Sequence, residues 1–358
     1  MKRWLGIFAI GLIAATALAA MNQRAIGQFL FERAVERQVG IDPTEALPDG
    51  LHAYVCGSGS PLPDAERAGP CIAVLAGQSA FVFDAGSGSI RKLGWMGFPM
   101  QKLDAAFLTH LHSDHLDGLG ELMLQAWMAG ARSSPLPIYG PPGTDRVVTG
   151  LMQAYAIDRG YRIAHHGPKV ARPGGFGGEA RIVSFDDAGD SDGLVYAADG
   201  VTIHAVPVEH APVDNAYAYR VDYKGRSLVI SGDTRFTERL ARFAEGADVL
   251  FHEALNPQMV GTLGKALADH GNADAASIMA DIPAYHTSPE DAARVAQRAG
   301  VDMLVFYHLL PAPPTGLMNA LFVGDAHRIF AGRIEVSEDG TLVSLPARSQ
   351  DIRVDRLL

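Results

Sequence analysis

The sequence is poor in charge, poor in cysteine and without an excess of basic residues. Only 20% of its 358 residues are charged while 48% are hydrophobic, which excludes a disordered or coiled-coil protein and favours a folded, enzyme-sized domain. After residue 20 it contains no further long apolar run, which excludes a second membrane-spanning segment. The net charge is -10 and no basic stripe is visible, so the composition predicts no nucleic-acid partner.

The two cysteines, Cys56 and Cys71, fall in runs that are typical of consecutive strands. In an oxidising compartment they could close a loop of about 15 residues, a bridge worth ~3 kcal/mol of stability. Two buried free thiols are the alternative.

The N-terminus reads MKRWLGIFAIGLIAATALAA over residues 1–20. Two basic residues, an apolar run and a small-residue end are typical of a secretory signal peptide. The run is only slightly shorter than a spanning helix, and apolar residues continue at helical spacing after it, so an uncleaved membrane anchor is the alternative. Either segment predicts an extracytoplasmic protein, periplasmic or secreted. We expect a helical lead-in over 21–48, one folded domain over 49–348 and a C-terminal tail over 349–358.

A mixed α/β domain opens near residue 50 with the β-rich runs LHAYV, CIAVLA, SAFVFDAG and DAAFLT. Residues from about 135 to 200 are rich in Gly and Pro, which predicts loops and a small hairpin on one side of a cleft. Strands return at VTIHAVPVEH, AYAYRVDY, SLVISGD and DVLFHE. The last clear helix is SPEDAARVAQRAG, with Ser288 as its N-cap, Pro289 at its first position and Gly300 at its end.

The strongest chemical signal is the segment THLHSDH, which follows an apolar strand. It places His110, His112, Asp114 and His115 on one short strand-to-helix loop. Imidazole and carboxylate are ligands that zinc prefers, and four of them on one loop favour two ions over one. A solvated polar loop is the alternative, but clustered imidazoles after an apolar strand have no packing reason to be there.

Three further candidate ligands each stand at the end of an apolar strand pattern. They are His210 after AVPVE, Asp233 after SLVISG and His308 after MLVFY. Strand ends present ligands rigidly, so we expect these side chains to complete the metal site.

These motifs, in this order, resemble the metallo-β-lactamase superfamily and, within it, the ribonuclease Z-like and arylsulfatase-like branch. The resemblance covers nearly all of residues 51–310 and implies an α/β fold, a single-domain, four-layer αββα sandwich with hydrolase activity. It also implies which residues bind which ion. One ion takes His110, His112 and His210, the other takes Asp114, His115 and His308, and Asp233 bridges both.

The resemblance extends to residues beside the metal ligands. Phe251-His252-Glu253-Ala254 and His286-Thr287-Ser288 resemble the glutamate and histidine that assist leaving-group protonation in ribonuclease Z-like enzymes. Asp84 resembles the aspartate that supports the site without binding metal. We therefore expect Asp114, His286 and Glu253 to be the catalytic residues, with Glu253 orienting and charging His286 as general acid.

The resulting hypothesis is a hydrolase with two divalent ions, zinc or else manganese, that cleaves a phosphodiester or related ester through a metal-held hydroxide. Only 22 residues separate His210 from Asp233, which leaves no room for the RNA-binding arm of ribonuclease Z enzymes. We therefore expect a small-molecule ester substrate, with no nucleic acid, and leave the oligomeric state open. The alternatives are an arylsulfatase-like enzyme, a metal-dependent lactonase or carboxylesterase, and a non-catalytic metal-binding protein.

Overall fold

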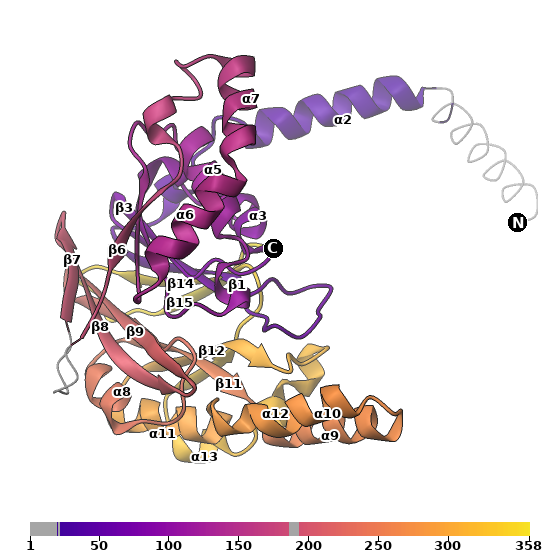
Figure 1. Cartoon of the computed structure of the whole chain (residues 1–358), viewed down its shortest axis with the longest axis vertical. Coiled ribbons are helices and arrows are strands. Elements are labelled where there is room, and N and C mark those ends of the chain that lie inside the picture. Colours follow the sequence, from indigo (N-terminus) through magenta and orange to yellow (C-terminus); the bar gives the residue numbers. More distant parts are fainter. Residues whose placement is uncertain (1–19, 21, 186–192) are drawn as a thin grey trace, which may run out of the picture. The chain divides into compact units, whose positions relative to one another are not determined.

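The computed structural model describes residues 20, 22–185 and 193–358 (Figure 1). The chain divides into two compact units at the boundary between Ala46 and Leu47. The first unit holds helix α2 (Gln23–Gln38) and the short helix η1 (Pro43–Ala46). The predicted signal or anchor segment, apart from Ala20, lies outside the described residues. None of the helices within those residues is both long and apolar enough to cross a membrane.

The second unit is built on two β-sheets. In spatial order, the first sheet contains β15 (Arg353–Arg356), β14 (Thr341–Pro346), β1 (Gly50–Gly57), β2 (Cys71–Ala76), β3 (Ser79–Phe83), β4 (Leu103–Phe107), β5 (Leu136–Gly140) and β6 (Gly178–Ile182). The second contains β13 (Arg333–Val336), β12 (Met303–Leu310), β11 (Val249–Leu255), β10 (Arg226–Ile230), β9 (Val213–Tyr223), β8 (Val201–His210) and β7 (Gly193–Ala198). Strands β10 to β13 run parallel to one another, as do β3 to β6.

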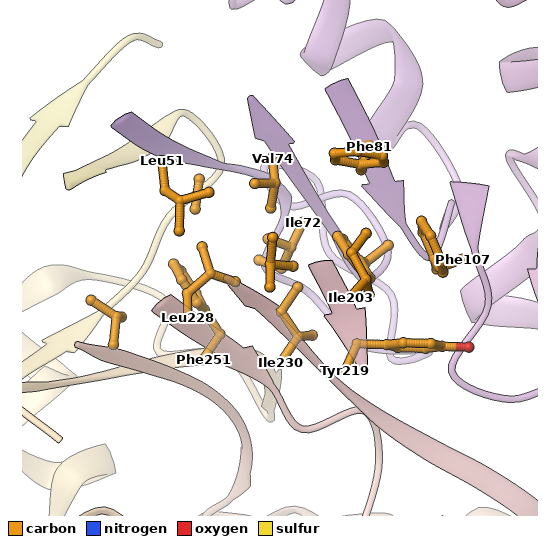
Figure 2. Packing of buried hydrophobic residues seen from close by; sticks show 14 of the residues in the cluster. Leu51, Ile72, Val74, Phe81, Phe107, Ile203, Tyr219, Leu228, Ile230 and Phe251 are labelled. Carbon is orange, nitrogen blue, oxygen red and sulfur yellow. The ribbon is translucent and has the colours of Figure 1, made fainter. Parts of the chain in front are cut away.

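The two sheets face each other across an apolar core. Alternate residues of a strand point to opposite faces of its sheet, and in β2 the inward set is Ile72, Val74 and Ala76. Ile72 and Val74 face Leu228 and Ile230 of the second sheet, as Figure 2 shows. The other set of β2 residues is also buried, under helices, which explains why CIAVLA contains no polar side chain.

Helices cover the outer face of each sheet. Those around the first sheet are α3 (Ser89–Trp95), α4 (Ser113–Leu116), α5 (Leu119–Met128), α6 (Thr144–Ala154) and α7 (Ala156–His166). Those around the second are α8 (Glu238–Phe243), α9 (Pro257–Asp269), α10 (Ala273–Asp281), α11 (Pro289–Ala299), α12 (Asn319–Val323) and α13 (Ala326–Ile329). Single 3-10 turns occur at η2 (Met100–Lys102), η3 (Pro173–Gly175), η4 (Ile282–Ala284) and η5 (Gly316–Met318). The predicted four-layer αββα sandwich is confirmed.

Two regions differ from the expectation. The segment from 135 to 200 contains helices α6 and α7 in addition to strands; Gly150 and Gly160 lie inside these helices, and the residues around them are compatible with a helix. Residues 349–358, expected as a tail, include the edge strand β15. The caps of α11 are as predicted: the Ser288 side chain accepts a hydrogen bond from the Asp291 amide, and Gly300 ends the helix with φ of 67°.

The predicted disulfide between Cys56 and Cys71 is present and joins the end of β1 to the start of β2. It closes a loop with a sequence separation of 15 residues. We expect the double substitution Cys56→Ser/Cys71→Ser to lower the free energy of unfolding by about 3 kcal/mol, because the unfolded chain regains loop entropy. Denaturant titration in non-reducing buffer measures this change. If the wild type and the variant unfolded at the same denaturant concentration, with or without reductant, the bridge would contribute nothing.

Candidate metal centre

The loop after β4 carries the first four candidate ligands. His112 is in extended conformation and is followed by the single helical turn α4, so Asp114 and His115 project in other directions than the histidines before them. His110 and His115 are fully buried, while Asp114 keeps 15% of its side chain exposed. The loop therefore presents ligands along two directions from one short segment.

One cluster combines this loop with the ends of β8 and β10. The distance from His112 Nδ1 is 2.9 Å to His110 Nε2 and 3.3 Å to His210 Nε2. Asp233 Oδ2 lies 3.9 Å from the first of these Nε2 atoms and 3.8 Å from the second. Ligand atoms 2.0–2.1 Å from a shared tetrahedral zinc ion would be roughly 3.3 Å apart, so the cluster has the dimensions of a metal site.

A second cluster lies directly beside the first. Asp114 Oδ2 is 3.6 Å from His115 Nε2 and 3.3 Å from His308 Nε2. Asp233 reaches this cluster as well, with Oδ1 at 3.3 Å from His115 Nε2 and Oδ2 at 3.3 Å from His308 Nε2. One carboxylate thus contacts both clusters, and the structure brings together all seven residues predicted as metal ligands.

Unpaired buried atoms show that the cluster suits a metal ion. Among the described residues, the buried atoms His115 Nε2 and Asp233 Oδ1 have no partner with hydrogen-bond geometry and face each other at 3.3 Å. Buried polar atoms without a hydrogen-bond partner destabilise the fold unless another group binds them. A divalent cation, which takes lone pairs from imidazole and carboxylate, satisfies both.

The pKa values agree with this chemistry. Burial lowers the pKa of His110, His112 and His210, which favours the neutral imidazole that binds metal. Burial raises the pKa of Asp233, but the surrounding histidines, His308 first, outweigh it and hold the pKa well below its usual range. The central carboxylate is therefore ionised at neutral pH.

Asp84, at the end of β3, supports the loop from behind. Its Oδ1 accepts a hydrogen bond from the Thr109 amide, and its Oδ2 accepts from Thr109 Oγ1 and lies 2.8 Å from His115 Nδ1. Asp84 and His308 both have positive φ, 56° and 47°, a strained conformation for non-glycine residues that clusters at functional sites. Residues with this strain persist only where their surroundings fix them, which these contacts do.

We expect Asp84→Asn to weaken metal affinity by about 10- to 100-fold, because it disturbs the hydrogen bond that orients the His115 ring. Titration against a chromogenic chelator measures the affinity. Asp117→Asn, an exposed neighbour of the same loop, is the control and should bind metal like the wild type. Equal affinities of Asp84→Asn and the control would show that Asp84 does not orient a ligand.

Glu253, in β11, and His286 lie next to the metal ligands. Glu253 is fully buried, and its Oε1 is 3.1 Å from His286 Nδ1 and also accepts a hydrogen bond from the Thr287 amide. His286 Nδ1 is 4.0 Å from Asp233 Oδ2. Burial lowers the pKa of His286, but the charge and hydrogen bond of Glu253 outweigh it and raise the pKa to about 9. All three predicted catalytic residues, Asp114 included, therefore border one site.

Sequence reasoning assigned no role to two contacts at this site. Thr109 Oγ1 lies 3.1 Å from His110 Nδ1 as well as on Asp84, so it links two ligand-bearing positions. The Tyr285 carbonyl oxygen lies 3.0 Å from His210 Nδ1, and the Tyr285 ring packs against the rings of His210 and His286. The position of Thr109 at the start of THLHSDH could have indicated its contact with His110. Nothing in the sequence indicates the contact between Tyr285 and His210.

Residues 80–309 match the family described as Beta-lactamase superfamily domain. The chain belongs to this superfamily, and the resemblance to its metal-dependent members is confirmed. Ribonuclease Z of Mycobacterium avium is 38% identical over 301 residues, which cover 84% of this chain and 100% of that protein. Ribonuclease Z of Mycobacterium bovis is 36% identical over 291 residues, 81% and 96% of the two chains.

Solved structures show the same fold. Human tRNase Z, short form, superposes with a TM-score of 0.58 at 19% identity and covers 82% of this chain and 99% of that one. The metallo-beta-lactamase fold protein YhfI from Bacillus subtilis gives a TM-score of 0.57 at 24% identity, with coverage of 83% and 100%. With its ribonuclease Z relatives, the chain is a metal-dependent hydrolase that acts on ester bonds, of the phosphodiesterase kind.

One prediction is wrong. We expected a small-molecule ester substrate and no nucleic acid, whereas relatives matched over their whole length are named as ribonucleases, enzymes that act on RNA. The error came from using the net charge of -10, a sum over the whole chain that does not reveal where basic side chains gather. The short connection between His210 and Asp233 was also given too much weight as evidence against RNA binding, because RNA can bind to other parts of a domain.

Proposed function

We propose that this protein is an extracytoplasmic phosphodiesterase that hydrolyses RNA with two divalent ions, zinc or else manganese. The proposal rests above all on one observation: Asp233 contacts two adjacent ligand clusters, with Glu253 and His286 directly beside them. His110, His112 and His210 would hold one ion, Asp114, His115 and His308 the other, and Asp233 both. When bound, such ions polarise water and the phosphoryl group and stabilise charge on the attacking and leaving oxygens.

The protein's own groups supply the remaining steps. Asp114, whose side chain is partly exposed, accepts a hydrogen bond from the attacking water and orients it toward phosphorus. As the new P–O bond forms, the attacking water loses a proton to solvent and the bond to the leaving oxygen breaks. His286 gives that oxygen a proton, so that it departs as a hydroxyl group. Because Nδ1 of His286 is hydrogen-bonded to Glu253, Nε2 is the nitrogen that faces the substrate.

Two features support a location outside the cytoplasm. The Cys56–Cys71 disulfide is of a kind that persists in oxidising compartments, and residues 1–20 have the pattern of a signal peptide or anchor. In this account the domain of residues 49–348 carries the activity and residues 21–48 connect it to the N-terminal segment. Cell fractionation with an antibody against the domain tests the location: recovery in the cytoplasm with free thiols would contradict it.

The direct test is RNA cleavage by the purified, zinc- or manganese-loaded protein, followed by gel electrophoresis of end-labelled products. We expect cleavage that stops when a chelator is added and returns when the metal ion is restored. Bis-p-nitrophenyl phosphate serves as a second substrate that reports the chemical step alone. Protein that carries its metal ions, cleaves neither compound and is folded by circular dichroism would contradict the proposal.

A further inference from the structure

A basic helical segment projects from the otherwise acidic domain. We call residues 144–172, which comprise α6, α7 and the turn after them, the α6–α7 arm. The arm contains five basic and two acidic side chains, whereas the whole chain has a net charge of -10. None of the residues of α7 is buried, and Figure 1 shows α7 at the end of the domain beyond α6.

The base of the arm lies against the loop that carries the metal ligands. A Cβ atom added at Gly143, the residue before α6, would be 3.0 Å from Cδ1 of Leu111, which stands between His110 and His112. The Tyr155 ring, between α6 and α7, packs against Gly120 in α5, the helix that follows the metal-binding loop. The arm thus starts at the candidate metal centre and leads away from it.

Some basic residues of the arm fix its shape, and others lie on its surface. Arg159 packs over the Phe176 ring at 5.5 Å and donates to the Pro173 carbonyl oxygen, so it holds α7 against the following turn. Arg146 and Lys169 are exposed, and Arg162 is half-buried beside Asp158. Arg146, Arg162 and Lys169 are therefore accessible to a ligand, and the fold does not depend on them.

Exposed apolar side chains accompany these charges. Ile157 and Tyr161 are 69% and 65% exposed and stand four residues apart, on one face of α7. An uncovered apolar face on a helix marks a binding surface when charged groups border it. Basic side chains interleaved with an aromatic ring match the chemistry of RNA, since cations neutralise phosphates and rings stack on unpaired bases.

We propose that the α6–α7 arm binds the backbone of the RNA substrate away from the scissile phosphodiester. This inference rests on the proposed function and gives it a docking element, which the short connection between His210 and Asp233 does not provide. The 11 residues of α7 extend about 16 Å at 1.5 Å per residue, enough to pass roughly five phosphates of one strand. Helix α7 contains no Trp, Phe or Leu, the side chains that anchor a helix at a membrane surface, so RNA is the favoured occupant.

The test compares two triple variants that remove the same charge. The arm variant is Arg146→Gln/Arg162→Gln/Lys169→Gln, and the control is Lys265→Gln/Arg294→Gln/Arg328→Gln, three exposed residues on α9, α11 and α13. Binding is measured by fluorescence anisotropy with a labelled RNA hairpin whose single-stranded 3′ extension has phosphorothioate linkages, over a series of salt concentrations. Cleavage is measured on the unmodified hairpin and on bis-p-nitrophenyl phosphate.

We expect the arm variant to bind the hairpin at least about tenfold more weakly than the control and to lower the slope of log affinity against log salt by about two. Its loss of kcat/KM should be at least about tenfold larger for RNA than for the small diester. Equal RNA binding by both variants would overturn the proposal, as would loss of binding to phosphatidylserine vesicles without loss for RNA. If RNA binding depended on the arm but no RNA were cleaved, the proposed function would be wrong, while the proposal that the arm binds RNA would still stand.

Discussion

Substitution of His286 by alanine is expected to lower kcat for RNA by about 10²- to 10⁴-fold and to leave turnover of bis-p-nitrophenyl phosphate much less affected. The RNA leaving oxygen is a poor leaving group without a proton, whereas p-nitrophenolate departs without one. His286 is suited to give that proton, because Glu253 contacts its Nδ1 at 3.1 Å and raises its pKa to about 9. Stopped assays on both substrates with the same enzyme preparation measure the difference.

Glu253→Gln is a second test of the roles of Glu253 and His286. The amide oxygen can still accept the hydrogen bonds, but the negative charge that raises the pKa of His286 is lost. The general acid is protonated below its pKa, so activity on RNA falls as the pH rises through that value. We expect the variant to lose activity at lower pH than the wild type. The exposed His270 supplies the control His270→Ala. An unchanged pH profile for Glu253→Gln, or equal losses on both substrates for His286→Ala, would contradict the assignment.

Asp233→Ala is expected to weaken metal affinity by at least about 100-fold and to reduce hydrolysis of both substrates by a comparable or larger factor. Among the residues that the structure describes, Asp233 is the one carboxylate within 4 Å of histidines of both clusters, at 3.3 to 3.9 Å. Its removal takes a ligand from each candidate ion and leaves His110 and His210 without the carboxylate that lies 3.9 and 3.8 Å from them. Elemental analysis after dialysis against a fixed free-zinc concentration gives the metal content. Asp269→Asn, an exposed carboxylate on α9, controls for loss of charge. An Asp233→Ala protein with two ions and full turnover would exclude the bridging role.

The sequence was most informative where a short motif follows an apolar strand. His210, Asp233 and His308 were found because each follows an apolar run, and the structure brings them to the loop of His110 to His115. His308 is not at a strand end as expected, because β12 continues to Leu310 and its pairing with β11 is irregular at His308. Strand ends are positioned by the sheets, so spacing in the sequence translates directly into position in the fold. The caps of α11 were found for a similar reason, since Ser288, Pro289 and Gly300 act through local backbone geometry.

Other features could not be predicted from the sequence, either because they depend on contacts between distant segments or because averaging over a long stretch hid them. The packing of Tyr285 on His210 joins residues 75 positions apart. Helices α6 and α7 were missed because the Gly- and Pro-rich average composition of residues 135 to 200 hid two helical stretches, each of which contains a glycine in its interior. The wrong prediction about nucleic acid came from averaging as well, because a net charge summed over the whole chain hides a local excess of basic residues such as that of residues 144–172.

The metal content of the purified domain tests the central claim most directly. Protein without its first 20 residues, saturated with zinc and freed of excess by gel filtration, should contain two ions per chain by elemental analysis, because Asp233 joins two complete ligand clusters. A folded protein that retains no ion, or only one, under these conditions would contradict a two-ion phosphodiesterase.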